Sequence, residues 1–293
     1  MPSPTPSARL GLVLEGGGMR ALFTAGVLDA LSETGIRFDG IIGVSAGAAF
    51  GCNWKSHQPG RALRYNVRFC RDPRYGSLRS LLRTGDLFDA EFCYRTLPRT
   101  LDPFDSAAFE ADPTRFWVVA TDADTGEAVC HEITVADDTA FDWFRASASM
   151  PIVSCPVPIG AHRYLDGGIA DPIPLARFES MGFARNLVIL TQPDGYRKKS
   201  ARILLPILSR LFLRRLPSVA AALAARPDLY NRARDHVAAR VSAGAAFVIR
   251  PPSPLPVGRT SRSPEALRRT HALGREAALR ALPSLLSWLS SPS

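Results

Sequence analysis

One serine lies in a setting that favours nucleophilic chemistry. Ser45 is the central residue of a G-x-S-x-G run whose outer glycines are Gly43 and Gly47. The run begins as an apolar, strand-like segment and ends in small residues that are typical of a closely packed helix. A sharp strand-to-helix turn of this kind, a nucleophile elbow, exposes the serine hydroxyl, and flanking glycines let the helix pack close to the strand. We therefore predict that Ser45 is a nucleophile.

A glycine-rich segment upstream suits the binding of negative charge. Gly16, Gly17 and Gly18 follow an apolar, strand-like run over residues 10–14, and a helical pattern begins just after Arg20. The free N–H groups at such a junction bind anions, because glycines allow close approach and the helix N-terminus carries partial positive charge. We expect them to stabilise the oxyanion of an acyl transfer. We expect Arg20 to shape the loop by hydrogen bonding or to neutralise a phosphate head group; a cation on the helix surface is the alternative.

The same glycines also form a broken G-x-G-x-x-G pattern, which makes dinucleotide binding an alternative. That fingerprint expects an acidic residue about 20 positions further on, at the end of the second strand. This chain has Gly43, Val44 and Ser45 at that place. A right-handed crossover would bring the two successive turns to the same edge of a parallel sheet. The glycine turn and the serine turn are therefore predicted to form one site.

A third motif places an aspartate at the end of an apolar stretch. Asp166 is followed by Gly167 and Gly168, a sequence that is by itself typical of an ordinary turn. Gly-Gly-Gly-x-Arg, Gly-x-Ser-x-Gly and Asp-Gly-Gly in this order, however, resemble the patatin-like lipid acyl hydrolases, and the bacterial patatin-like phospholipases above all. The resemblance covers most of the chain and extends to three further segments, residues 125–127, 172–175 and 247–251.

The resemblance implies a Ser-Asp dyad in place of a Ser-His-Asp triad, with Ser45 as nucleophile and Asp166 as its partner. It implies a lipid or phospholipid ester as substrate and an α/β fold, in which helices cover both faces of a mostly parallel central sheet. Its oxyanion hole comprises Gly16, Gly17, Gly18 and Arg20, and its motif-supporting glycines are Gly43, Gly47, Gly167 and Gly168. We expect no cofactor and no metal. The chain departs from the family at Ala21, where glycine is usual, and we read Ala21 as the first helical residue.

A carboxylate base requires help from its surroundings. The pKa of a free aspartate is near 3.9, so its carboxylate accepts a proton weakly at neutral pH. Burial between the serine turn and the strand end at Leu165 would raise the pKa of Asp166 and bring it closer to that of the serine proton. We therefore expect Asp166 to be buried.

Two other functions remain open. An α/β-hydrolase-type esterase with a Ser-His-Asp triad would need His236 or His271 as its base, and the early position of Ser45 counts against it. The remaining histidines are His57, His131 and His162, and none has a motif around it. A catalytically inactive patatin-like lipid-binding protein is the other alternative, for which Ala21 is the one hint.

Strand-like and helical segments alternate along the chain. Apolar strand-like runs at residues 10–14, 41–44, 186–191 and 245–249 are separated by helical patterns, which predicts a mostly parallel sheet covered on both faces. Residues 61–113 are predicted as helices and loops that shape an acyl pocket. We divide the chain into a disordered arm at 1–7, a catalytic domain at 8–252, and a C-terminal helical extension at 253–293 that packs on the domain.

Composition and charge favour a cytoplasmic enzyme. The first residues contain no apolar signal segment, no run approaches 18 apolar residues, and the five cysteines form no C-x-x-C pair, which fits reduced thiols. The net charge is +9, and residues 195–227 contain no acidic residue. We expect a basic amphipathic helical stretch at 197–242 and peripheral contact of that stretch with an anionic membrane. No motif indicates nucleic-acid binding, and no obligate protein partner is inferred.

Overall fold

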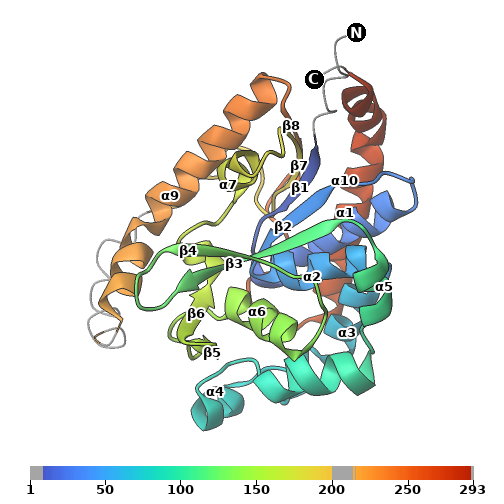
Figure 1. Ribbon diagram of the computed structural model, residues 1–293. Coiled ribbons are helices and arrows are strands. Elements are labelled where there is room, and N and C mark those ends of the chain that lie inside the picture. Colours follow the sequence, from blue (N-terminus) through green and yellow to red (C-terminus); the bar gives the residue numbers. More distant parts are fainter. Residues whose placement is uncertain (1–8, 200–213, 215, 292–293) are drawn as a thin grey trace.

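The computed structural model describes residues 9–199, 214 and 216–291. Within them, eight strands form one sheet in the order β5-β6-β3-β2-β1-β7-β8, with β4 also paired to β3 (Figure 1). The strands are β1 (Leu10–Leu14), β2 (Gly40–Val44), β3 (Arg115–Asp122), β4 (Ala128–Glu132), β5 (Val157–Ile159), β6 (His162–Asp166), β7 (Arg185–Ile189) and β8 (Ala246–Ile249). Strands β3, β2, β1, β7 and β8 pair in parallel in this order. Strands β4 and β6 pair antiparallel with β3, and β5 pairs antiparallel with β6. The predicted mostly parallel sheet is confirmed.

Both faces of the sheet are buried. In β1, Leu12 and Leu14 pack on one face and Val13 on the other, and none of the three is exposed. Because successive side chains of a strand point to opposite faces, a sheet covered on both sides needs apolar residues at nearly every position. The unbroken apolar run of β1 is therefore a consequence of helices on both faces.

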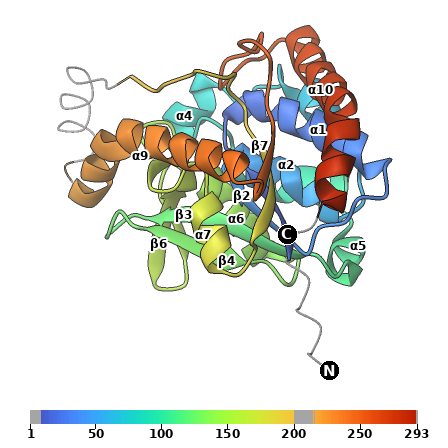
Figure 2. The ribbon, with the colours of Figure 1, turned by 90° about the horizontal axis from the view of Figure 1, so that it is seen from above.

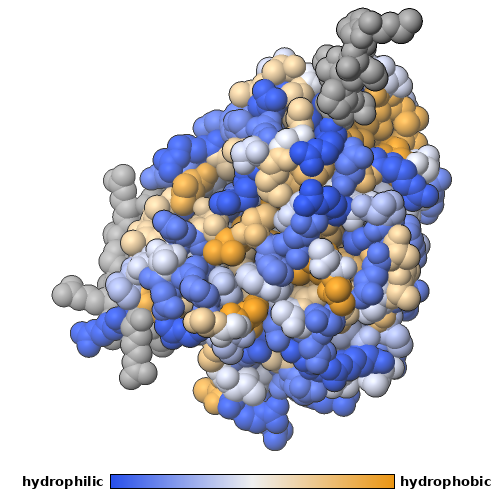
Figure 3. Space-filling view, in the orientation of Figure 1, coloured by the Kyte–Doolittle hydropathy of each residue, from blue (hydrophilic) through white to orange (hydrophobic). Residues whose placement is uncertain are grey.

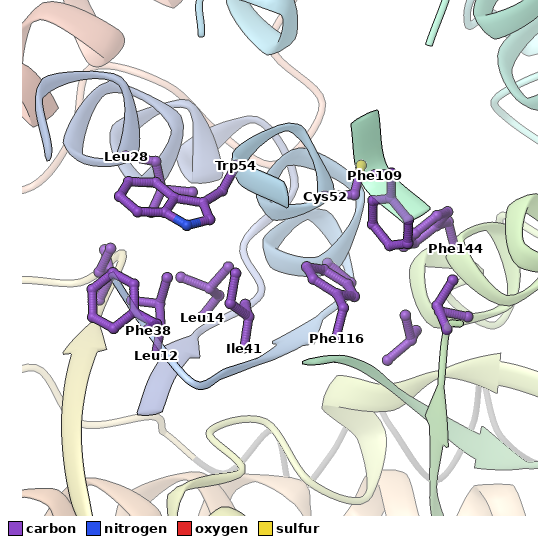
Figure 4. Close-up of a cluster of buried hydrophobic side chains, with 14 of the residues drawn as sticks. Leu12, Leu14, Leu28, Phe38, Ile41, Cys52, Trp54, Phe109, Phe116 and Phe144 are labelled. Atoms are coloured by element: carbon purple, nitrogen blue, oxygen red, sulfur yellow. The ribbon is translucent and has the colours of Figure 1, made fainter. Parts of the chain in front are cut away.

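Helices divide between the two faces (Figure 2). One face is covered by α1 (Leu22–Ser32), α2 (Ala46–Lys55), α6 (Asp138–Ala148) and α10 (Pro264–Ser290). The other face is covered by α7 (Leu175–Ser180) and α9 (Pro217–Ser242). Figure 4 shows the first cluster, where Leu12, Leu14 and Ile41 of the strands meet Leu28 of α1 and Trp54 of α2. This arrangement confirms the predicted layers.

The segment between β2 and β3 is mainly helical, as predicted. It contains α3 (Arg61–Phe69), α4 (Leu78–Thr84), a π-helix (Phe92–Leu101) and α5 (Ser106–Ala111). Two 3-10 turns complete the described helices, at Gly18–Ala21 before α1 and at Gly167–Ile169 after β6. The prediction that Ala21 is the first residue of the helix is off by one residue, because Ala21 ends the 3-10 turn and α1 begins at Leu22.

The C-terminal helix α10 crosses α1 at two glycines. A Cβ atom at Gly26 of α1 would lie 2.0 Å from the carbonyl oxygen of His271, and one at Gly274 of α10 would lie 2.1 Å from that of Phe23. Real Cβ atoms do not approach backbone oxygens so closely, since close-packed interiors leave no such overlap. The two helix backbones therefore meet directly, and any larger residue at either glycine would separate them.

The basic stretch predicted at 197–242 is described only in part. Residues 200–213 and 215 lie outside the described residues, and Arg202, Arg210 and Arg215 are among them. From Pro217 onwards the stretch is α9, which buries Tyr230 and Val237 against the sheet. Among the described residues, no helix is both long and apolar enough to cross a membrane. Figure 3 shows one face of the molecule, on which hydrophobic side chains form small, separate patches among hydrophilic ones.

Candidate active site

Ser45 occupies a strained turn between β2 and α2. Its backbone has φ 56° and ψ −132°, and a positive φ is uncommon for a residue with a side chain. The flanking glycines allow the close packing that the turn requires. A Cβ atom at Gly43 would lie 2.6 Å from Cα of Ala48, and one at Gly47 would lie 2.7 Å from the carbonyl oxygen of Leu14. The predicted elbow is therefore present, with its glycines used for close approach.

The hydroxyl of Ser45 points at Asp166. Ser45 Oγ donates a hydrogen bond of 2.7 Å to Asp166 Oδ2, and both residues are buried, at 9% and 2% exposure. The other carboxylate oxygen, Oδ1, accepts from the backbone N–H of Gly168 at 2.8 Å. The backbone N–H of Asp166 donates to the carbonyl oxygen of Ser149 at 2.8 Å. The carboxylate is thus fixed from both sides, with one oxygen left for the serine.

The sheet register explains why two residues 121 positions apart meet. Strand β3 pairs with β4 along one edge. Along its other edge it pairs first with β2, whose last residue, Val44, lies opposite Val119. It then pairs with β6, whose last residue, Asp166, lies opposite Ala120. Strands β2 and β6 therefore approach each other end to end. Ser45 follows the last residue of β2 and Asp166 is the last residue of β6, so the shared edge brings the two side chains together.

The turn after β6 fits only glycine at its first position. A Cβ atom at Gly167 would lie 2.1 Å from the carbonyl oxygen of Val119, and one at Gly168 would lie 3.0 Å from Asp166 Oδ1. Gly167 thus lets the chain pass directly against β3, and Gly168 lets its own N–H reach the carboxylate. The predicted supporting role of this pair has a steric basis in both residues.

Burial dominates the electrostatics of Asp166. Removal from water raises the pKa of this carboxyl group above its ordinary value, because the charged form loses hydration. The nearby Arg226 guanidinium opposes this rise, followed by the hydrogen bonds from Ser45 and Gly168. Asp166 is therefore a stronger base than a free aspartate, while the nearby charge of Arg226 still favours its ionised form.

The glycine loop lies against the serine turn. A Cβ atom at Gly16 would lie 2.8 Å from Cβ of Ser45, and Gly18 has φ 57°, which a residue with a side chain rarely adopts. The N–H groups of Gly16, Gly17 and Gly18 donate to no described residue. The N–H of Ser45 itself is not available, because it donates to Ser147 Oγ at 2.7 Å. The three glycine N–H groups near the nucleophile therefore have no hydrogen-bond acceptor among the described residues.

Arg20 does not shape the glycine loop through its side chain among the described residues. Its backbone N–H donates to the carbonyl oxygen of Gly17 at 3.3 Å, but its Nε is buried and has no described partner. Burial lowers the pKa of the guanidinium, as does the neighbouring Arg259, while Glu15 raises it. Arg20 also lines the cavity beside Ser45, and its predicted role toward a ligand stays a prediction.

A buried glutamate anchors the glycine loop, and sequence reasoning missed it. Glu15 directly precedes Gly16 and is 2% exposed. Its Oε2 accepts from the backbone N–H of Thr191 at 2.5 Å, and its Oε1 accepts from the hydroxyl of Tyr230 at 2.8 Å. Burial raises the pKa of Glu15, and these two hydrogen bonds oppose the rise. The sequence signal that could have identified Glu15 is its position between the apolar run at residues 10–14 and the three glycines.

A cavity of about 460 Å³ opens beside Ser45 and Asp166. One wall is apolar and comes mainly from α2, α3, α6 and the helical segment between β2 and β3. Its members include Phe50, Tyr65, Tyr75, Phe88, Leu97 and Phe144. A second part of the lining, which we call the cationic wall, carries Arg20, Lys198, Arg226 and Arg259. The other two lining arginines, Arg61 and Arg145, pair with Asp102 and Asp86. The cavity lining can therefore contact both an apolar chain and a charged group.

All five histidines lie away from this cavity. Four contact carboxylates elsewhere: His57 with Asp112, His162 with Asp122, His236 with Glu179, and His271 with Asp29. The fifth, His131, stacks on Trp143 with ring centroids 4.2 Å apart. None of them lines the cavity. The base that a Ser-His-Asp triad needs is thus absent from the surroundings of Ser45.

Two protein-family models match this chain. A family model described as patatin-like phospholipase matches residues 12–178, and one described as a domain of unknown function, DUF6363, matches residues 216–290. The uncharacterized protein YjjU of Escherichia coli is 32% identical over 65% of this chain and 54% of its own length. An uncharacterized NTE family protein of Mycobacterium tuberculosis is 30% identical over 76% of this chain and 61% of its own length.

The neuropathy target esterase sws of Drosophila melanogaster is 28% identical over 61% of this chain and 13% of its own length. The chain therefore spans little more than half the length of the first two relatives and a small part of this esterase. The family match over residues 12–178 contains Ser45, Asp166 and the glycine loop, and it covers more than half of the chain. This protein belongs to the patatin-like phospholipase family.

Proposed function

We propose that this protein is a lipid acyl hydrolase that uses Ser45 as its nucleophile and Asp166 as its base. The observation that carries the proposal is the 2.7 Å hydrogen bond from Ser45 Oγ to Asp166 Oδ2 at the wall of the cavity. Hydrogen-bond contact between a hydroxyl and a base is what nucleophilic catalysis by serine requires. Membership of the patatin-like phospholipase family supports the same reaction class.

The proposed reaction has two halves. Ser45 Oγ attacks the ester carbonyl carbon and gives its proton to Asp166, while the N–H groups of Gly16, Gly17 and Gly18 hold the oxyanion. The tetrahedral intermediate collapses, the carbon–oxygen bond to the alcohol breaks, and the proton on Asp166 passes to the leaving alkoxide. Water then attacks the acyl-enzyme with Asp166 again as base, which releases the carboxylic acid and restores the Ser45 hydroxyl.

The two walls of the cavity indicate the kind of ester. Burying an apolar chain against the aromatic wall contributes roughly 0.8 kcal/mol per methylene group. A short ester makes little use of that wall, whereas a fatty acyl ester fills it. Binding energy from a chain remote from the carbonyl can orient the reacting group. We therefore place the acyl chain on the aromatic wall and the scissile carbonyl between Ser45 and the glycine loop.

The conformation of Ala21 speaks against an inactive lipid-binding protein. Ala21 has φ −68° and ψ −4°, which an alanine adopts without strain, so the family's usual glycine is not needed there. The residue is fully buried. The departure at Ala21 therefore leaves the glycine loop free to act as proposed.

Contact with an anionic membrane is proposed through α4. Leu78 and Leu82 are 72% and 88% exposed on this helix, and Arg79 lies between them on the chain. The segment that follows, Leu87 and Phe88, lines the cavity. Exposed apolar side chains beside cations match the apolar and anionic layers of a lipid surface.

The experiment is hydrolysis of a short-chain ester and of a phospholipid by wild type, Ser45→Ala and Ser180→Ala. Ser180 is an exposed serine at the end of α7, outside the cavity, and serves as the matched control. We expect Ser45→Ala to lose both activities while its melting temperature stays near that of wild type. We expect Ser180→Ala to keep both. Hydrolysis by Ser45→Ala at a rate similar to wild type would contradict the proposal.

A further inference from the structure

Four cations gather on one wall of the cavity. They are Arg20 after the glycine loop, Lys198 between β7 and α9, Arg226 on α9, and Arg259 between β8 and α10. Three of the four lie beyond the patatin match at residues 12–178, and two lie within the segment of unknown function at residues 216–290. The C-terminal part of the chain therefore supplies most of the charge of this wall.

Two of these cations are tied to the turns that carry the proposed chemistry. Arg226 Nε donates to the carbonyl oxygen of Gly168, two residues after Asp166. The carbonyl oxygen of Arg259 accepts from the N–H of Met19 at 3.0 Å, and a Cβ atom at Gly18 would lie 2.4 Å from it. Arg226 thus stands at the turn after β6 and Arg259 at the glycine loop. The cations flank the site from both sides.

Lys198 is another cation of this wall and lies beside Tyr230 of α9. Its Nζ lies 5.2 Å from the ring centroid of Tyr230, whose hydroxyl donates to Glu15 ahead of the glycine loop. Burial, together with the charges of Arg226 and Arg259, lowers the pKa of Lys198 to about 7. This repulsion shows that the cations act on one another.

None of the four cations forms an ion pair with a carboxylate among the described residues, although 20 ion pairs occur elsewhere in that part of the chain. The two buried acids of the site are already engaged, Glu15 by Thr191 and Tyr230, and Asp166 by Ser45 and Gly168. Gathering partly buried cations without anionic partners costs free energy through desolvation and repulsion. The buried Nε of Arg20, which has no described partner, adds an unused donor. The wall is therefore arranged for an anion that the protein does not supply.

We propose that Arg20, Lys198, Arg226 and Arg259 bind the phosphate of a glycerophospholipid whose acyl chain lies on the aromatic wall. The inference rests on the proposed hydrolase function and adds to it the residues, mainly from the C-terminal part of the chain, that hold the phosphate. In such a lipid the phosphorus lies only a few covalent bonds from the ester carbonyl, so the phosphate of a lipid held at Ser45 falls beside the serine turn. Guanidinium groups bind phosphate oxygens through paired, charge-assisted hydrogen bonds.

The proposed subsite assigns a function, binding of the phosphate, to the segment at residues 216–290. Arg226 and Arg259 reach the cavity only because α9 covers one face of the sheet and the chain after β8 returns to the glycine loop. The segment would then select the phosphate-bearing substrate, while residues 12–178 hold the reacting groups.

The test compares two lipids with the same acyl chain, lysophosphatidylglycerol and monoacylglycerol, of which only the first carries a phosphoglycerol head group. The variants are Lys198→Met, Arg259→Gln, their combination and the charge-keeping Arg259→Lys, with melting temperatures to confirm folding. The readout is the kcat/KM for lysophosphatidylglycerol divided by that for monoacylglycerol, because a loss common to both lipids cancels in this ratio. We expect each single substitution to lower this ratio roughly 10-fold and the double variant roughly 100-fold, since a hydrogen bond to a charged group has this strength.

The matched control is Arg232→Gln. Arg232 is exposed on α9, six residues after Arg226, and does not line the cavity, so the ratio should stay at the wild-type value. Arg259→Lys should retain more of the ratio than Arg259→Gln. A ratio that the double variant leaves unchanged, or that Arg232→Gln lowers equally, would overturn the subsite.

Binding separates this inference from the hydrolase proposal. Calorimetry with Ser45→Ala and lysophosphatidylglycerol measures the subsite without turnover. Binding that weakens roughly 10-fold on adding Arg259→Gln would support the subsite even if no ester were hydrolysed. Inorganic phosphate is the second ligand, and binding as tight as that of the lipid would overturn the proposal in favour of a free-phosphate site.

Discussion

The two walls of the cavity come from regions of the chain that are built differently. Residues 12–178 carry the serine, the aspartate and the glycine loop on short turns at the ends of strands, where the backbone fixes each group. Residues 216–290 contribute long side chains from α9 and from the segment before α10. The first region can position a reacting atom accurately, and the second can surround a ligand. Under the proposed function, the first region would carry out the chemistry and the second would select the substrate.

The division is not complete, because the C-terminal region also holds the glycine loop. Tyr230 donates to Glu15 ahead of the loop, and the carbonyl oxygen of Arg259 accepts from Met19 after it. The loop is therefore fixed at both ends by residues from the other region. Substitutions that affect one contribution at a time can measure how far the two roles separate.

The largest effect is expected at the base. Asp166→Asn keeps the shape of the side chain but removes its proton acceptor, and we expect kcat/KM to fall about 10³- to 10⁴-fold for any ester. Asp171→Asn is the control, because Asp171 pairs with Arg177 six residues further on and does not line the cavity. Steady-state hydrolysis of a neutral short-chain ester measures both. A loss below about tenfold for Asp166→Asn would show that another group takes the proton.

A smaller effect is expected when the C-terminal region loses its hold on the loop. Tyr230→Phe removes the hydroxyl that donates to Glu15 and keeps the ring, so we expect kcat to fall about 3- to 10-fold. Tyr196→Phe is the control, since its ring packs on Tyr230 but its hydroxyl has no described hydrogen bond. Equal kcat values for the two variants would mean that the loop does not depend on this contact.

The pH profile should reveal the cation beside the base. Arg226 lowers the pKa of Asp166, so Arg226→Gln should raise it. A base must be deprotonated, and activity is therefore lost as pH falls through this pKa. We expect the acid limb of kcat/KM for a neutral ester to move to higher pH by about one unit. Groups that remain around Asp166 are Ser45, Gly168 and Arg259. An acid limb that stays in place or moves lower would contradict this electrostatic role.

The smallest effect on catalysis is expected at the contact between α1 and α10. Gly274→Ala would place a Cβ atom 2.1 Å from the carbonyl oxygen of Phe23, so the helices must separate. We expect the free energy of unfolding to fall by roughly 1–3 kcal/mol, with kcat nearly unchanged. Gly258→Ala is the control, because the nearest atom to its Cβ would be 3.9 Å away. Denaturant unfolding checks both, and a stable Gly274→Ala would place the helices farther apart than described.

Local signals in the sequence were sufficient for the serine turn and the glycine loop. Strand β1 spans Leu10–Leu14, as its apolar run indicated, and Ser45 follows β2 at a strained turn. The pairing of Ser45 with Asp166 depended on the family resemblance. It arises because β2 and β6 share one edge of β3, and no local pattern encodes that register.

The cationic wall could not be predicted from the sequence. Arg226 and Arg259 have no motif around them and lie in segments rich in arginine, so nothing distinguishes them from surface cations. Their position depends on how α9 lies across the sheet and on the return of the chain to the glycine loop. The start of α1 could be predicted from the sequence to within one residue, at Ala21 in place of Leu22.

The central claim is that Ser45 forms a covalent acyl-enzyme. The most direct measurement is labelling by a fluorophosphonate, followed by mass spectrometry of the intact protein and of its peptides. We expect one label per wild-type chain, on the peptide that contains Ser45, slower labelling of Asp166→Asn and none of Ser45→Ala. A label on another residue, or labelling of Ser45→Ala at the wild-type rate, would contradict it.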